Sequence, residues 1–446
     1  MASDRRLIAR HAATVLVGQL AVMAFGVTDT IVAGRYAEGA LAALSVGSAI
    51  FISVYVSLMG GLQALLPIWA ELHGGRRTAE VGRSVRQSLY LCAAAIALGM
   101  ALLLFPAPLL RWTEVPAAMR DDVEAYLQVL AFALAPALLF RLFSTLSQSL
   151  GKPQLVTWLQ LASLGLKLPL SIWFTFGGAG LPAMGLVGCG WATLVVNYAM
   201  LGAAIWLLRS DPFYTGYRFW QRIEPPDWRA LRQFARLGVP AGLSVLVEVT
   251  SFTLMALFIA RLGTAASAAH QIAANLTAVA YMMPLSLSIA TSARVSFWLG
   301  AGDAALARRA CARGFELTVL FALLFAGAMA ALRWQLAAVY SANPAVIELG
   351  ASLLLATALY HFADALQTLC VFVLRCYHVT VMPLVLYCAL LWGMGLGGGY
   401  LLAYRGIGPW AAMASPLAFW LMAAGALALT AGLFVALLLA TLRRRR

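Results

Sequence analysis

The strongest chemical signal in the sequence is an aspartate inside an apolar stretch. Asp364 lies near the middle of residues 353–377, which are apolar enough to cross a bilayer. A carboxylate at the bilayer centre costs about 2.5–3.5 kcal/mol on insertion scales. Tyr360 lies four residues before Asp364 and Gln367 three after, so one helix face presents a hydroxyl, a carboxyl and an amide. The pattern indicates a protonatable or cation-binding site; the alternative is an acid satisfied by a neighbouring helix.

Glu248 is a second acid in an apolar run, VPAGLSVLVEVTSFTLM, with Ser244 and Ser251 on its helix face. No Arg or Lys lies near it in sequence, so it needs a proton, a bound cation or a partner from another helix. Glu248 and Asp364 together would form a coupled pair that exchanges protons against a cation. The alternative is a carboxyl that is hydrogen-bonded to a facing helix.

Gln271 and Asn275 lie four residues apart in HQIAANLTAVAYMM and share a helix face. Their amide oxygens would suit a hard cation or would hold the two acids in place. The alternative is polar contact between helices, worth around 1 kcal/mol.

The first half of the chain has its own buried charges. Asp29 lies in FGVTDTIVAGR, and it either pairs with Arg35 near the interface or belongs to a functional site. Lys167 in LASLGLKLPLSIW either extends its ammonium to the interface or pairs with Asp29. Arg141 is expected to extend its side chain to the inner interface.

The elements that carry these residues are membrane helices. Of the 446 residues, 63% are hydrophobic and 11% are charged, whereas soluble proteins average about 25% charged. We expect an all-α polytopic membrane protein with a single membrane domain. The six cysteines show no ligand spacing and no catalytic motif is present, so we expect no metal centre, no cofactor and no enzyme activity.

Twelve spans are predicted, each apolar and near or above the roughly 20 residues that a crossing helix needs. They lie at roughly 9–34, 42–70, 84–106, 122–146, 154–175, 182–208, 235–261, 268–298, 310–332, 347–375, 380–404 and 409–441. Most Lys and Arg residues, Arg375 among them, then fall in alternate loops or at the inner ends of spans, which places both termini in the cytoplasm. This distribution explains the net charge of +14 without nucleic acid binding.

The two halves of the chain resemble each other weakly. ELHGGRRTAEVGRSVR follows the second span and WLGAGDAALARRACAR follows the eighth, so Gly75 aligns with Gly302 and Arg86 with Arg313. We therefore expect an N-terminal six-helix lobe at 1–209, a cytoplasmic linker at 210–235 and a C-terminal six-helix lobe at 236–446. Both halves start inside, which implies a pseudo-two-fold axis along the membrane normal.

Several segments resemble the multidrug and toxic compound extrusion (MATE) transporters, and in particular their NorM-type branch. They are GVTDTIVAGRYAEGALAALSVGSAIF, VPAGLSVLVEVTSF, AAHQIAANLTAVAYMMPLSLSIATSARVSFWLGAGD and FADALQTLCVFVLRCYH. The resemblance covers nearly the whole chain. It implies a secondary active antiporter in a bacterial-type inner membrane that exports amphipathic, cationic drugs in exchange for Na⁺ or H⁺. We expect a monomer in the lipid bilayer.

The resemblance also implies roles for individual residues. It places Glu248 and Asp364 as the coupling acids, which would be metal ligands only if the coupling ion is Na⁺. Tyr360 matches a position near that site, as do Gln271 and Asn275, and Asp29 matches the N-terminal-lobe acid. Lys167 departs from the family pattern, because it stands where a neutral polar residue is usual. A lipid-linked precursor flippase of the same superfamily is the alternative function. Against it, three acids, Asp29, Glu248 and Asp364, outnumber the two bases, Arg141 and Lys167, that are assigned to the membrane interior.

Overall fold

The computed structural model of the chain describes residues 4–107, 117–178, 180–409 and 411–444. Within these ranges, twelve helices are long and apolar enough to cross a membrane, so the predicted all-α class with twelve spans is confirmed. The chain forms two compact units. The first unit is Val17–Gly242, and the second unit combines Met1–Leu16 with Leu243–Arg446. The predicted lobe and linker boundaries at 1–209, 210–235 and 236–446 stay a prediction.

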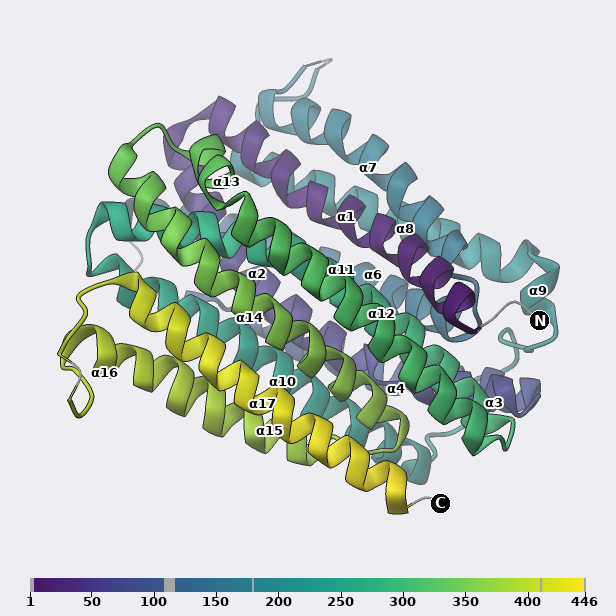
Figure 1. The fold of residues 1–446 in the computed structure, drawn as a ribbon. Helices are drawn as coiled ribbons and strands as arrows, with labels where there is room; N and C mark the ends of the chain where they lie inside the picture. The colour runs from purple at the N-terminus through teal and green to yellow at the C-terminus, as the bar shows by residue number, and fades with distance from the viewer. Residues whose placement is uncertain (1–3, 108–116, 179, 410, 445–446) are drawn as a thin grey trace. The chain divides into compact units, whose positions relative to one another are not determined.

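The first unit contains most of α1 (Asp4–Tyr36) and the first part of α10 (Trp228–Ala260). Its other helices are α2 (Glu38–Gln63), α3 (Leu66–Gly74), α4 (Thr78–Leu104), α6 (Ala117–Ser149), α7 (Pro153–Phe176), α8 (Leu186–Ser210) and α9 (Pro212–Thr215), as Figure 1 shows. In this unit α6 packs against α2, α4 and α8, so much of α6 is buried.

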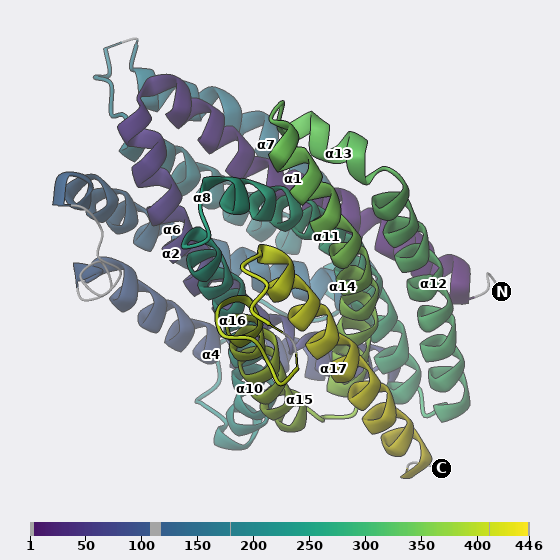
Figure 2. The same cartoon turned by 60° about the vertical axis from the view of Figure 1, so that its left-hand side comes forward.

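The second unit contains the remainder of α10. Its other helices are α11 (Thr264–Gly300), α12 (Ala304–Ala331), α13 (Arg333–Tyr340), α14 (Pro344–Cys376), α15 (Val381–Tyr387), the π-helical segment η1 (Cys388–Gly398), α16 (Gly399–Tyr404) and α17 (Pro416–Arg444). Helix α14 packs against α11, α12 and α17, and Figures 1 and 2 show it running beside them. α14 is therefore the central helix of this unit, and its polar residues are enclosed by other helices.

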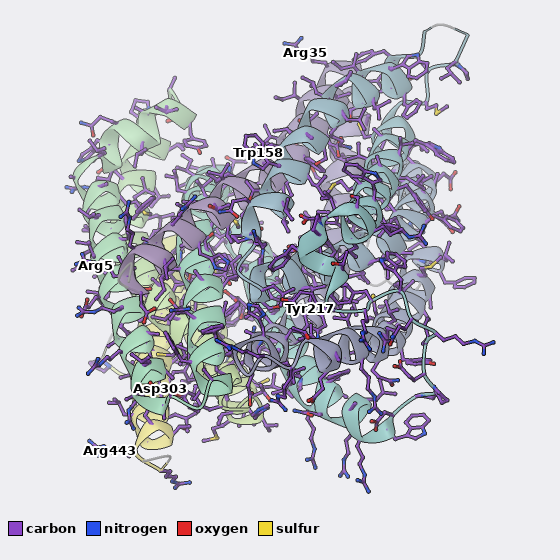
Figure 3. All side chains as sticks on the ribbon, turned by 90° about the vertical axis from the view of Figure 1, so that its right-hand side faces the viewer. Arg5, Arg35, Trp158, Tyr217, Asp303 and Arg443 are labelled. Carbon is purple, nitrogen blue, oxygen red and sulfur yellow. The ribbon has the colours of Figure 1, made fainter. Side chains whose placement is uncertain are left out.

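Local sequence signals set the start of α14. Asn343 precedes the helix, and its Oδ1 accepts a hydrogen bond of 3.0 Å from the backbone N–H of Ala345. Pro344 occupies the first turn, where its missing N–H leaves no helical bond unmade. From this fixed start the helix carries Asp364 into the buried interior. Asp303 and Arg443 lie at the same end of the second unit (Figure 3).

Residues 211–227, which precede α10, form an ordered strap that lies against other helices of the first unit. Arg86 of α4 is only 4% exposed and forms an ion pair with Glu224, while its Nη1 donates to the carbonyl of Arg218 at 2.6 Å. Tyr90 donates to the carbonyl of Glu224 at 3.0 Å. The hydroxyl of Tyr217, labelled in Figure 3, shares a hydrogen bond of 3.0 Å with Nδ1 of His73. These contacts tie the strap to α3 and α4 of the same unit.

Two further residues fit the strap to the helices. A Cβ added at Gly82 would lie 1.9 Å from the carbonyl oxygen of Tyr217, so only glycine admits this close approach. Asp227 ends the strap, and its Oδ1 accepts from the backbone N–H of Arg229 at 3.0 Å, which caps the first turn of α10. Helix α10 therefore begins at Trp228, inside the segment that the sequence analysis assigned to the linker.

The ion pair of the strap leads to a pH-dependent stability. The Arg86 guanidinium hydrogen-bonded to Glu224 lowers the pKa of that carboxyl to about 2, below its ordinary value of about 4.3. Its contribution to stability is therefore complete above pH ~4.3 and is lost as the pH falls towards 2. We expect Glu224→Gln to lower the unfolding temperature at pH 7 and to have a smaller effect at pH 3, as measured by thermal unfolding in detergent.

Glu80→Gln is the matched control for this experiment. Glu80 forms an exposed ion pair with Arg77 at 3.5 Å, and exposed pairs contribute little to stability. The control should leave the unfolding temperature unchanged at both pH values. An equal loss from both variants, or a loss from Glu224→Gln that does not depend on pH, would contradict the assignment.

Candidate functional site in the second unit

The face of α14 around Asp364 forms a buried polar network. Asp364 is 2% exposed, and its Oδ1 accepts a hydrogen bond of 2.8 Å from Nε2 of Gln367. The same amide nitrogen donates to Thr368 at 3.2 Å, and the amide oxygen accepts from the hydroxyl of Tyr387 on α15. Tyr281 of α11 hydrogen bonds to Thr368. Asp364 is thus held by a chain of amide and hydroxyl groups contributed by three helices.

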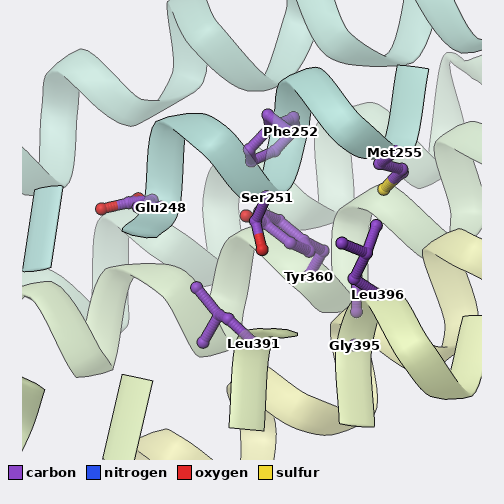
Figure 4. Close-up of a pocket in the computed structure, with 9 residues that line it drawn as sticks. Glu248, Ser251, Phe252, Met255, Tyr360, Leu391, Gly395 and Leu396 are labelled. Atoms are coloured by element: carbon purple, nitrogen blue, oxygen red, sulfur yellow. The ribbon is translucent and has the colours of Figure 1, made fainter. Parts of the chain in front are cut away.

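Glu248 of α10 borders a small cavity in the same unit (Figure 4). Tyr360 of α14 and Ser251 also line it, and the Oγ of Ser251 is buried with no hydrogen-bond partner in the described part of the chain. Leu391 and Gly395 of η1 close another side. π-Helical turns are often found at functional sites, because they shift the side chains that follow. The cavity therefore places a carboxylate beside two oxygen groups in an apolar surrounding.

Glu248 and Asp364 interact electrostatically within the second unit. Glu248 lies within electrostatic reach of Asp364, and Tyr360 interacts with both carboxyl groups. Tyr360 is 4% exposed, and its ring packs edge-on against Phe252 at 5.8 Å and Trp420 at 5.6 Å between centroids. These rings fix the phenol beside the acids. The structure thus brings together Glu248, Asp364 and Tyr360, whose coupling role stays a prediction.

Arg375 is a member of this site that the sequence analysis missed. We counted it among the cytoplasmic positive charges, but it is 5% exposed and interacts electrostatically with Glu248, Tyr281 and Tyr387. Its guanidinium lies 4.6 Å from the ring centroid of Phe372. It follows Asp364 by about three helical turns and so shares its face of α14. This helical spacing was the signal in the sequence that could have indicated Arg375 as a member of the site. The second unit thus places one guanidinium near two acids.

Gln271 and Asn275 lie apart from the network. Both side chains are exposed, and Nε2 of Gln271 donates to Oδ1 of Asn275 at 3.2 Å. The i,i+4 spacing did place them together on α11, but on its exposed face. The structure therefore does not bring them to Glu248 or Asp364, and their supporting role stays a prediction.

The acid of the first unit has a counter-charge. The ammonium of Lys167 on α7 lies 2.8 Å from Oδ1 of Asp29 on α1, and Ser171 donates to the same oxygen at 3.2 Å. Lys167 is fully buried and also donates to the carbonyl of Cys189 at 3.1 Å and to Thr193 at 2.7 Å. Of the alternatives that the sequence left open, the structure shows the pair. Lys167 does not extend to the interface.

A close approach of α8 to α7 makes this pair geometrically feasible. A Cβ added at Gly188 would lie 2.6 Å from the backbone carbon of Phe174, so a larger residue would push the helices apart. The glycine lets the first turn of α8 reach α7, where the carbonyl of Cys189 receives Lys167. The ammonium then has an acid, a carbonyl and a hydroxyl as partners.

Arg141 of α6 corrects one expectation. We expected its side chain to reach the inner interface, but Arg141 is 4% exposed and its Nη2 donates to Oε1 of Gln63 at 3.0 Å. The prediction was wrong because α6 is enclosed by other helices of the first unit, so the guanidinium lies among them instead of at the interface.

The oxygen groups around Glu248 suit a proton or a small hard cation. Among the residues that the structure describes, no group of three or more His, Cys, Asp or Glu side chains could hold a metal ion. The carboxylates of Glu248 and Asp364, with the hydroxyls of Ser251 and Tyr360, are the kind of ligands that Na⁺ prefers. The same carboxylates can also be neutralised by protons.

Comparisons with known proteins decide the family. A family model described as MatE matches residues 15–173 and 240–401, which is more than half of the chain. The chain belongs to the MatE family. It is 38% identical over 398 residues to a protein of Aromatoleum aromaticum called probable multidrug resistance protein NorM, covering 89% of this chain and 86% of that one. These matches place it in the NorM-type branch of the MATE transporters.

A second relative agrees with this assignment, and a solved structure matches the fold. A protein of Chromobacterium violaceum, also called probable multidrug resistance protein NorM, is 37% identical over 90% of this chain and 86% of its own length. The crystal structure of the eukaryotic MATE transporter AtDTX14 matches the fold with a TM-score of 0.87 at 17% identity, over 99% of this chain and 98% of that one. The MatE fold therefore extends over the whole described chain.

Proposed function

We propose that this MatE protein is a secondary active antiporter that exports amphipathic, cationic drugs or toxic compounds in exchange for Na⁺ or H⁺. It works in a bacterial inner membrane with both termini in the cytoplasm. The observation that carries the proposal is a pair of acids, the buried Asp364 and the half-buried Glu248, which interact inside an apolar unit. The relatives' names, which refer to multidrug resistance, support the choice of cargo.

These two acids explain how two fluxes would be coupled. A carboxylate inside a bilayer is stable only when a proton, a cation or a paired base neutralises it. A cationic substrate and a coupling ion that neutralise the same acids exclude each other, and each weakens binding of the other by the same factor. Exchange follows when the site faces the two sides of the membrane in turn. Arg375 supplies part of the neutralising charge at Glu248.

Proteoliposomes with one gradient at a time test the proposal. We expect the reconstituted protein to move ethidium, a cationic dye, when either a Na⁺ gradient at equal pH or a pH gradient without Na⁺ is imposed. The gradient that drives movement identifies the coupling ion. The measurement is dye fluorescence over time, and protein-free vesicles are the control. Absence of dye movement under both gradients, from protein that is folded and monodisperse, would overturn the proposal.

A further inference from the structure

The buried basic residues of the chain differ in how they are neutralised. Four Arg and Lys residues are buried in the described ranges: Arg86, Arg141, Lys167 and Arg375. Three of them interact with an acid. Arg86 pairs with Glu224, Lys167 pairs with Asp29, and Arg375 interacts with Glu248. Arg141 has none among the described residues, where its partners are an amide and a phenol. A buried charge without a counter-charge is strongly unfavourable, so Arg141 is a position where an anion would be stabilised.

The cluster around Arg141 contains hydrogen-bond donors that have no partner in the described structure. Nη2 of Arg141 donates to Oε1 of Gln63 at 3.0 Å, but Nε of Arg141 and Nε2 of Gln63 are buried with no partner in the described structure. Two turns further along α6, the amide of Gln148 bonds to Ser144 at 3.2 Å and keeps its oxygen unpaired. That amide can present either its oxygen or its NH₂ group. The cluster therefore offers a guanidinium and at least one amide donor to an oxygen anion, and guanidinium groups bind carboxylates through paired N–H bonds.

Tyr55 of α2, which interacts with Arg141, belongs to an aromatic pair. Phe51 and Tyr55 are one helical turn apart, and their rings are stacked with centroids 5.8 Å apart and planes 5° from parallel. Tyr55 interacts electrostatically with Arg141. Both rings are half-buried, whereas the guanidinium is enclosed. A flat aromatic ligand gains contact area from such rings, and Tyr55 would bring its acid group towards Arg141.

We propose that Arg141, Gln63 and Tyr55 form a subsite for the carboxylate of an aromatic acid, with the stacked rings of Phe51 and Tyr55 receiving its ring system. The first unit thus takes the anionic end of anionic or zwitterionic amphiphiles, a cargo class that the acids of the second unit would not bind. The inference rests on the proposed function only in treating this ligand as cargo. Binding itself is a property of the first unit alone.

Equilibrium binding to the purified protein tests the subsite with two matched probes. 2-Naphthoate carries the carboxylate, and 2-naphthamide has the same rings without the charge. We expect naphthoate to bind at least about tenfold more tightly, because a site built to pair with a charge rejects the analogue that lacks it. Arg141→Gln should remove this preference and leave the affinity for naphthamide unchanged. Arg141→Lys should recover part of it, because lysine keeps the charge but not the paired donors.

Controls separate the subsite from general effects. Arg313→Gln makes the same chemical change at an exposed arginine that pairs with Glu316 at 2.7 Å, and it should leave both affinities unchanged. Where Arg141→Gln is not monodisperse, Gln63→Leu and Tyr55→Phe carry the test and should each weaken naphthoate binding more than naphthamide binding. Equal loss for the two probes, or no loss in any of these variants, would overturn the subsite.

Ethidium transport distinguishes failure of the subsite from failure of the proposed function. If the wild type moves ethidium while naphthoate binding does not depend on Arg141, the subsite is wrong and the antiporter assignment stands. If the wild type moves no ethidium while naphthoate binding depends on Arg141, the anion site stands and the antiporter assignment is wrong. We expect ethidium movement in the wild type together with Arg141-dependent naphthoate binding.

Discussion

Asp364→Asn is expected to abolish ethidium efflux, down to the level of protein-free vesicles, while the protein stays folded. The substitution keeps the size of the side chain, and the asparagine oxygen can accept the hydrogen bond that Gln367 now donates at 2.8 Å. It removes the carboxyl group that we propose binds a proton or a cation. Glu248→Gln should give the same loss, because the two acids interact and act as one site.

The measurement is efflux from proteoliposomes under the gradient that drives the wild type, together with size-exclusion profiles and unfolding temperatures of each variant. Glu316→Gln is the matched control, since Glu316 is an exposed acid on α12 of the same unit and pairs with Arg313 at 2.7 Å. The control should transport like the wild type. Full efflux by both Asp364→Asn and Glu248→Gln would refute the coupling role.

The second large effect is on stability, in the first unit. Lys167→Met should destabilise the protein by about 3–5 kcal/mol, because it leaves the carboxylate of Asp29 buried without its counter-charge. The double variant Asp29→Asn with Lys167→Met should recover most of this loss, since replacing both members of a buried ion pair by neutral groups is often close to neutral. Unfolding free energies of the four proteins in the cycle give the interaction energy.

The same variants separate structure from function at Asp29. If Asp29 serves only as the counter-ion of Lys167, the double variant should fold and should keep ethidium efflux. If Asp29 also takes part in coupling, the double variant should fold and lose efflux. A single substitution Lys167→Met that costs less than about 1 kcal/mol would show that the pair is not what holds α1 against α7.

Helical periodicity was sufficient to describe the face of α14. Tyr360, Asp364 and Gln367 were expected on one face, and all three are buried, with Gln367 hydrogen-bonded to Asp364. The same periodicity extends to Arg375, but the rule of positive charges in cytoplasmic loops assigned it to the helix end. That rule uses position along the chain, whereas burial depends on which neighbours surround the end of the helix.

Helix α11 shows what the spacing of residues along one helix cannot predict. The spacing of Gln271 and Asn275 correctly indicated that their side chains meet, at 3.2 Å. Which face of α11 points towards the acids depends on how α11 packs against α12 and α14, and that packing sums many apolar contacts distributed along three helices. No spacing within α11 contains this information.

The sequence by itself determined the membrane class, the twelve spans and the identity of the costly charges, because length, hydropathy and helical period are properties of local segments. Only the tertiary structure decided how those charges are neutralised. It paired Lys167 with Asp29, enclosed Arg375 near Glu248, and left Arg141 with an amide and a phenol. These outcomes depend on side chains far apart in the sequence, whose distances are set by helix packing in a medium where each unpaired charge is costly.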